Sequence, residues 1–90
     1  MLFMVIETFR NGDAKSAYRR FKKLGRVMPE GLSYVGSWTS ADLRRCFQIM
    51  ETDDVTLLQQ WVSDWSDLVE FEIVPIVSGK ETAEALADRL

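Results

Sequence analysis

The sequence predicts an α+β domain in which two helices cover one face of a four-stranded antiparallel sheet. Three observations support this prediction. Four segments are rich in β-branched and aromatic residues, as strands are. Two further segments repeat their apolar residues at intervals of three and four, as amphipathic helices do. The segments follow one another as strand, helix, strand, strand, helix, strand, which is the βαββαβ order of the ferredoxin-like fold.

The first two elements are a strand over residues 2–9 and a helix over residues 13–24. The turn signal Asn11-Gly12 ends the strand. Asp13 is suited to cap the helix N-terminus, and Gly25 is suited to follow its last residue. The apolar positions along one face of this helix are Ala14, Ala17, Tyr18, Phe21 and Leu24.

The middle of the chain is expected to form a hairpin and a second helix. The hairpin strands cover residues 32–39 and 43–50, with Ser40-Ala41-Asp42 between them. Thr52 or Asp53 then offers an N-cap for the helix. The apolar face of this helix consists of Val55, Leu58, Trp61, Val62 and Trp65.

The chain is expected to end with a fourth strand over residues 69–77 and a short helix. Ser78 and Glu81 have the spacing of a capping box, which marks the start of a helix. We therefore divide the chain into a ferredoxin-like domain over residues 1–77 and a C-terminal helical tail over residues 78–90.

Length and composition limit how this fold can be stabilised. A chain of 90 residues buries only about two-thirds of the surface that it exposes when unfolded, so its core is small. Cys46 is the only cysteine and histidine is absent, so we expect neither an internal disulfide nor a metal site. No cofactor-binding motif is present, and we expect no cofactor. Association with a second copy is the remaining route to stability.

The apolar residues of the predicted sheet also favour a homodimer. Two helices cover one face, yet both faces of the first strand are apolar: Leu2, Met4 and Ile6 alternate with Phe3 and Val5. An uncovered apolar face calls for a partner. We expect a second copy to pack on it sheet to sheet about a two-fold axis. The alternative is that the tail helix covers this face.

No membrane or export segment is expected. The apolar residues 1–6 are too short for a secretory signal and lack a preceding basic segment, so we interpret them as part of a strand. No segment approaches the roughly 20 apolar residues of a membrane span. We therefore expect a cytoplasmic protein with no membrane partner.

The charged residues are unevenly distributed along the chain. Seven of the eleven basic residues lie between Arg10 and Arg26, whereas residues 51–72 contain seven acids and no base. The Arg/Lys-Gly-aromatic pattern of RNA-binding modules is missing around Phe47, and the net charge is -3. We therefore expect no nucleic-acid partner. Instead, the basic helix and the acidic stretch are interpreted as solvated surfaces that complement each other within or between subunits.

Several short motifs resemble a known family. These are Arg45-Cys46-Phe47-Gln48-Ile49-Met50-Glu51, then Trp61, Trp65-Ser66-Asp67-Leu68, Phe71-Glu72 and Pro75. They resemble an uncharacterised family of short bacterial domains in the dimeric α/β-barrel superfamily, and the resemblance is nearly full length. It implies a ferredoxin-like dimer but no activity. The superfamily holds cofactor-free monooxygenases, haem-degrading enzymes, isomerases and ligand-binding effector domains, and fold alone does not select among them.

A candidate ligand site lies in the predicted hairpin. Strand alternation places Tyr34, Gly36 and Trp38 on one face, where Gly36 would leave a slot between the two rings for a flat apolar ligand. Hairpin pairing would bring Gln48 and Met50 beside them. Alternatively, Gly36 marks a bulge or lets another backbone approach closely.

Other residues have both a structural and a functional interpretation. Gln48 would orient a ligand, or bond Tyr34 or a buried water. Trp61 belongs to the core, or one edge of its ring lines a pocket between helix and sheet. Cys46 is best interpreted as a core thiol, because no histidine can act as its base. Glu70 and Glu72 form a carboxylate pair that suits acid–base chemistry or protects a sheet edge.

Three functions remain open from the sequence. The first is a homodimer that binds a small apolar or aromatic ligand at Tyr34, Trp38, Gln48, Met50 and Trp61. The second is a cofactor-independent enzyme of the monooxygenase or isomerase type that uses the same pocket. The third is an assembly module without a ligand. The sequence identifies no catalytic residue.

Overall fold

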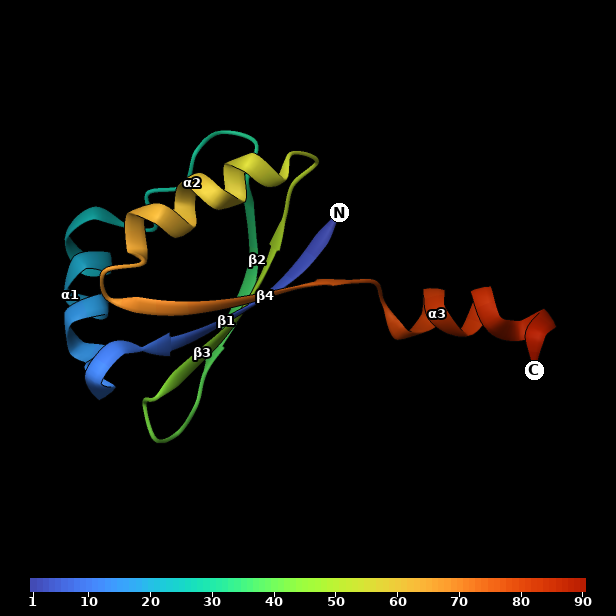
Figure 1. The fold of residues 1–90 in the computed structure, drawn as a ribbon, viewed down its shortest axis with the longest axis horizontal. Coiled ribbons are helices and arrows are strands. Elements are labelled where there is room, and N and C mark those ends of the chain that lie inside the picture. Colours follow the sequence, from blue (N-terminus) through green and yellow to red (C-terminus); the bar gives the residue numbers. More distant parts are fainter.

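The computed structural model describes residues 1–90 and has the predicted order of elements (Figure 1). The strands are β1 (Leu2–Phe9), β2 (Ser33–Thr39), β3 (Arg45–Glu51) and β4 (Val69–Ile76). The helices are α1 (Ala14–Leu24), α2 (Val55–Trp65) and α3 (Gly79–Leu86). The strands form one antiparallel sheet in the order β2-β3-β1-β4. The α+β, ferredoxin-like prediction is therefore confirmed.

The first residue of each of the two covering helices is determined by an N-cap side chain that accepts a hydrogen bond from a backbone N–H group. At α1 the Asp13 carboxylate accepts a hydrogen bond from the Ser16 backbone N–H at 3.1 Å, as predicted. At α2 the cap is Asp54, which accepts from the Thr56 N–H at 2.9 Å. The predicted cap, Thr52 or Asp53, was wrong by one or two positions. The Thr52 hydroxyl instead accepts from the Asp54 N–H at 3.0 Å and so precedes the cap.

A β-bulge at Val35 changes which side chains of β2 share a face. Before the bulge Tyr34 lies opposite Met50, and after it Trp38 lies opposite Phe47. Met50 and Phe47 are three residues apart on β3 and so point to opposite faces. The prediction that Tyr34 and Trp38 share one face is therefore wrong, because one extra residue reverses the alternation.

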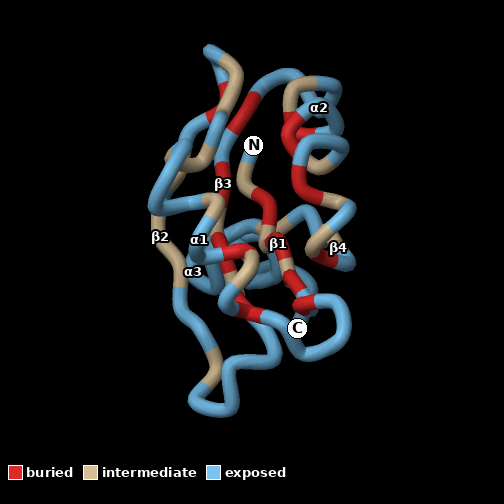
Figure 2. Tube along the Cα trace, turned by 90° about the vertical axis from the view of Figure 1, so that its left-hand side faces the viewer, coloured by how far each residue is buried: buried red, intermediate tan, exposed pale blue.

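The buried core lies between the sheet and the two helices. One cluster joins α2 to β1 and β3 through Leu58, Phe3 and Met50, and a second joins α1 to β1 through Ala17 and Phe9. Figure 2 shows buried residues along β1, β3 and α2, whereas β2 and α3 are intermediate or exposed. Because Phe3 and Phe9 lie on the same face of β1, both helices cover the same side of the sheet.

The opposite face of the sheet is free of helices. Its apolar side chains are partly exposed, and they include Leu2, Met4, Ile6, Phe47 and Ile49. The predicted tail helix is present as α3, but it extends away from the sheet and does not cover this face (Figure 1). None of the helices combines the length and the apolar composition needed to cross a membrane.

Candidate functional site

A cavity of about 90 Å³ lies between the two helices and the covered face of the sheet. Eight of its twelve lining residues are hydrophobic. Aromatic side chains supply much of this apolar wall, from β1, α1 and α2, and they include Phe9, Phe21, Trp61 and Trp65. A concave apolar site with a few polar groups is typical of small-molecule binding.

The charged group at the sheet side of the cavity is Glu7 of β1, which is only 8% exposed. Its one hydrogen-bond partner is the Cys46 thiol opposite it on β3, a weak donor. Burial raises the pKa of the Glu7 carboxyl above its ordinary value of 4.5, and the Cys46 thiol and the Arg26 guanidinium oppose this shift. Glu7 is thus a buried carboxylate without a strong partner.

Sequence reasoning missed Glu7, although a signal was present. Glu7 interrupts the alternating apolar run of Phe3, Val5 and Phe9 that faces the core. A single carboxylate at a core position of a strand is unusual enough to indicate a site.

The positive charge of the cavity comes from Arg26, in the loop between α1 and β2. The indole Nε1 atoms of Trp61 and Trp65 both donate to the Arg26 carbonyl oxygen, at 2.9 and 3.0 Å. The guanidinium lies over the Tyr34 ring, 3.6 Å from its centroid. The next residue, Val27, has a φ of 57°, a left-handed conformation that strains a β-branched residue. Two tryptophans and a tyrosine therefore hold Arg26 in place.

Gln48 and Ser37, which lie opposite each other on β3 and β2, are further polar groups of the covered sheet face that line the cavity. Gln48 has an acceptor atom without a protein partner. Its Nε2 atom donates to Met50 Sδ at 3.2 Å, and its Oε1 atom accepts no hydrogen bond from the protein. No fully enclosed polar side-chain atom lacks a partner, so Oε1 is accessible, and the accessible part of Gln48 borders the cavity. A bond from Gln48 to Tyr34, one of the alternatives for this residue, does not form, and the Tyr34 hydroxyl pairs with Ser37 Oγ at 2.8 Å.

The candidate residues divide into three groups. Gln48 and Trp61 line the cavity, and Trp61 is also part of the core. Tyr34 and Met50 lie on the covered face of the sheet and do not line the cavity. Each contacts a lining residue: Tyr34 contacts the Arg26 guanidinium, and Met50 accepts a hydrogen bond from Gln48. Trp38 lies on the helix-free face with 61% of its surface exposed.

The predicted slot at Gly36 is filled by Trp38 itself. A Cβ atom at Gly36 would lie 3.1 Å from Trp38 Cη2, so the glycine allows the indole to lie against the strand. The alternative interpretation of Gly36 as the mark of a bulge agrees with the register shift between Tyr34 and Gly36. Gly36 also permits close approach, although a side chain approaches instead of a backbone.

The thiol of Cys46 is suited to packing and not to nucleophilic attack. Burial, followed by the negative charge of Glu7, raises its pKa to about 11. At neutral pH the group is protonated, and only the thiolate is a strong nucleophile. The interpretation of Cys46 as a free core cysteine is supported.

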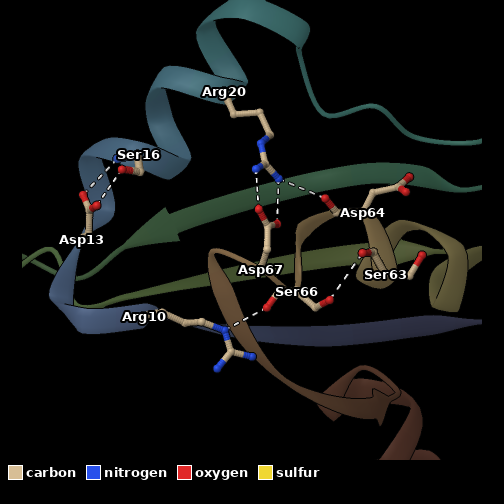
Figure 3. A network of polar contacts seen from close by, with 8 residues as sticks. All are labelled: Arg10, Asp13, Ser16, Arg20, Ser63, Asp64, Ser66 and Asp67. Carbon is tan, nitrogen blue, oxygen red and sulfur yellow. Dashed lines mark hydrogen bonds and ion pairs between the residues drawn. The ribbon is translucent and has the colours of Figure 1, made fainter.

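Polar contacts at the surface hold the two helices over the cavity (Figure 3). The Arg20 guanidinium of α1 donates two hydrogen bonds to Asp67, at 2.9 and 2.6 Å, and one to the Asp64 carbonyl oxygen at 3.0 Å. These bonds lower the pKa of the Asp67 carboxyl. Arg10 donates to the Ser66 carbonyl oxygen at 2.8 Å. The predicted complementarity of the basic helix and the acidic stretch therefore occurs within one subunit.

Comparison with known proteins identifies the family. The model of a family described as "Domain of unknown function (DUF3303)" matches residues 1–90. The chain belongs to this family. The resemblance to an uncharacterised family of short domains is thereby confirmed at this level, while the proposed superfamily stays a prediction. No curated protein matches this DUF3303 domain in sequence.

A solved structure shares the fold of this DUF3303 domain. It is described as "Structure of Rv0793 from Mycobacterium tuberculosis" and has a TM-score of 0.50 and 15% sequence identity. The similarity covers 86% of this chain and 95% of that chain. At this identity the comparison supports the fold and not the activity.

The cavity of the DUF3303 domain combines three chemical groups in an apolar space. Glu7 can accept a hydrogen bond or a proton, the Gln48 Oε1 atom can accept a hydrogen bond, and Arg26 can balance a negative charge. This set suits an uncharged molecule that carries a hydroxyl or carbonyl group.

Proposed function

We propose that this DUF3303 domain is a cytoplasmic homodimer that binds a small, largely apolar ring compound between its helices and its sheet. The observation that carries the proposal is the combination of apolar walls with two acceptor groups of buried residues, Glu7 and Gln48 Oε1, that face the cavity and lack strong partners in the protein. Leaving such groups unpaired costs stability. A ligand hydroxyl or N–H group would supply the missing donor.

The size of the cavity limits the ligand. An engineered protein cavity of about 150 Å³ holds one benzene molecule. The cavity here, at about 90 Å³, encloses less than that. Its wall includes Tyr18 and Phe21, which are 45% and 38% exposed and therefore border the solvent. A single ring can enter between them with part of it left outside.

We assign the candidate residues different parts in binding. Gln48 and Trp61 contact the ligand, Tyr34 acts by supporting the Arg26 guanidinium, and Met50 acts by holding the Gln48 amide. Trp38 takes no part, because it lies on the other face of the sheet.

A binding measurement with a filled-cavity variant tests this function. Ala17 lines the cavity and is 6% exposed, so Ala17→Leu places three extra carbons in the ligand space. We expect 4-nitrophenol to quench the tryptophan fluorescence of the wild type in a saturable way. The affinity obtained from this quenching should be at least tenfold lower for Ala17→Leu. Trp38→Ala is the matched control and should keep the affinity. Equal affinity in Ala17→Leu would contradict the proposed site.

The homodimer is supported by the helix-free face of the sheet. Partly exposed apolar side chains such as Met4 and Ile49 run across this face, and α3 leaves it open. Native mass spectrometry is expected to show a dimer that Ile49→Lys converts to a monomer, because a charge at the interface centre cannot be desolvated cheaply. The same spectrum reports any retained ligand. A monomeric wild type would contradict the proposed dimer but would leave the proposed ligand binding in the cavity unaffected.

A further inference from the structure

Glu7 is the only carboxylate that lines the cavity, and it has no evident structural task. It makes no ion pair, and its only hydrogen-bond partner is a thiol. On the sheet it lies between Cys46 of β3 and Phe71 of β4, so neither neighbouring strand offers a strong donor. A buried carboxylate in this setting destabilises the fold. Its presence at the cavity surface therefore points to chemistry.

The surroundings make Glu7 a stronger base than an exposed carboxylate. The charged or titratable groups that share the cavity with it are Arg26 from the loop, Cys46 from β3 and Tyr18 from α1. The cavity residues of α2 and β4, Trp61, Trp65 and Val69, carry no charge. Burial therefore dominates, and the carboxylate binds a proton more tightly than in water.

Arg26 supplies the complementary charge. Its guanidinium is permanently positive and lines the same cavity as Glu7. The Tyr34 ring stacks against the guanidinium, and the two tryptophan donors fix the backbone of Arg26 through its carbonyl oxygen. A negative charge that develops on a ligand in this cavity is stabilised by a positive group that is already in place.

We propose that the cavity catalyses proton transfer on a small enolisable carbonyl compound, with Glu7 as the acid–base group and Arg26 as the oxyanion partner. This activity rests on the ligand binding proposed above and extends it. Glu7 carries the proton, and neither an oxidant nor a cofactor takes part.

The reaction proceeds in two balanced steps. Glu7 removes a proton from the carbon next to the carbonyl group; the C–H electron pair forms a carbon–carbon double bond, and the carbonyl π pair moves onto oxygen beside Arg26. In a substrate with a β,γ carbon–carbon double bond this enolate is a dienolate. Protonated Glu7 then gives its proton to the γ-carbon, the oxygen electron pair re-forms the carbonyl bond, and the remaining carbon–carbon double bond is conjugated with it. The product is an isomer of the substrate, and Glu7 is again a carboxylate.

A general probe of base catalysis tests the proposal. Removal of the ring C–H proton from 5-nitrobenzisoxazole breaks its N–O bond and forms a coloured cyano-nitrophenolate, with no other reactant. We expect the wild type to catalyse this elimination, and Glu7→Gln to be slower by about a hundredfold, as is typical for loss of a general base. The rate should rise with pH through a midpoint above 4.5.

The control is Glu72→Gln, which removes an exposed carboxylate on the other face of the sheet. It should keep the wild-type rate. If Glu7→Gln also keeps the rate, or the wild type does not exceed Glu7→Gln, the proton-transfer inference is overturned. In that case saturable binding of 4-nitrophenol would still support the proposed binding function. A wild type that neither binds 4-nitrophenol nor catalyses the elimination would overturn both the binding function and the proton-transfer inference.

Discussion

The carbonyl oxygen of Arg26 accepts hydrogen bonds from two tryptophans, and this sharing has a measurable consequence. Trp61→Phe or Trp65→Phe alone leaves the oxygen with one donor. Each single change removes one neutral hydrogen bond, about 1 kcal/mol, besides the packing of the larger ring. The double variant leaves a partly buried acceptor without any donor, which costs about 1–3 kcal/mol. Because the second removal then costs up to about 3 kcal/mol in place of about 1 kcal/mol, we expect the double variant to lose up to about 2 kcal/mol more than the sum of the single variants.

Urea unfolding of the four proteins measures this coupling directly. A control cycle combines Trp61→Phe with Asp13→Ala, which removes the α1 cap and about 1 kcal/mol at a separate site. That pair should be additive within about 0.5 kcal/mol. If the tryptophan pair is equally additive, water replaces the missing donors, and the argument that the two rings jointly position Arg26 is refuted.

Three further predictions concern stability and reactivity. Glu7→Gln should raise the thermal unfolding temperature at neutral pH but not in acid. The raised pKa of Glu7 means that its stabilising contribution is complete below pH 4.5 and is lost as pH rises through the folded-state pKa. An equal effect at both pH values would contradict this linkage. Cys46 should react with iodoacetamide much more slowly in the folded protein than in urea, since its pKa is about 11 and it is 6% exposed; equal rates, followed by mass spectrometry, would disprove its burial. Val27→Gly should raise the free energy of unfolding by about 1 kcal/mol, because glycine relieves the left-handed strain; a loss of stability in urea would show that its side chain contributes more than the strain removes.

Much of the fold was predictable because it depends on local patterns. The strand over residues 2–9, the Asp13 cap and the start of the tail helix at Ser78 all agree with the structure. Each depends on neighbours within about four residues, where periodicity and capping are decisive. The second cap was displaced to Asp54 because several hydroxyl and carboxylate side chains compete at that point.

The candidate site was predictable only in part. Gln48 and Trp61 were identified because a polar or large aromatic residue on an apolar element stands out in the sequence. The grouping of Tyr34 with Trp38 failed because of a bulge at Val35. Gly36 indicated a bulge as one alternative, but a glycine in a strand does not by itself distinguish a bulge from a regular strand. The role of Arg26 could not be predicted either. Arg26 lies in a loop, and its position depends on two tryptophans of α2 that donate hydrogen bonds to its carbonyl oxygen.

The sequence by itself determined the elements, their order and the apolar character of both sheet faces, because these follow from residue spacing along one strand or helix. Only the tertiary structure decided that Glu7, Arg26 and Gln48 meet in one cavity and that Trp38 lies outside it. The spatial proximity of these side chains depends on strand register and on the hydrogen bonds that fix the loop conformation. Both are set by contacts between residues far apart in the chain, which a local pattern does not contain.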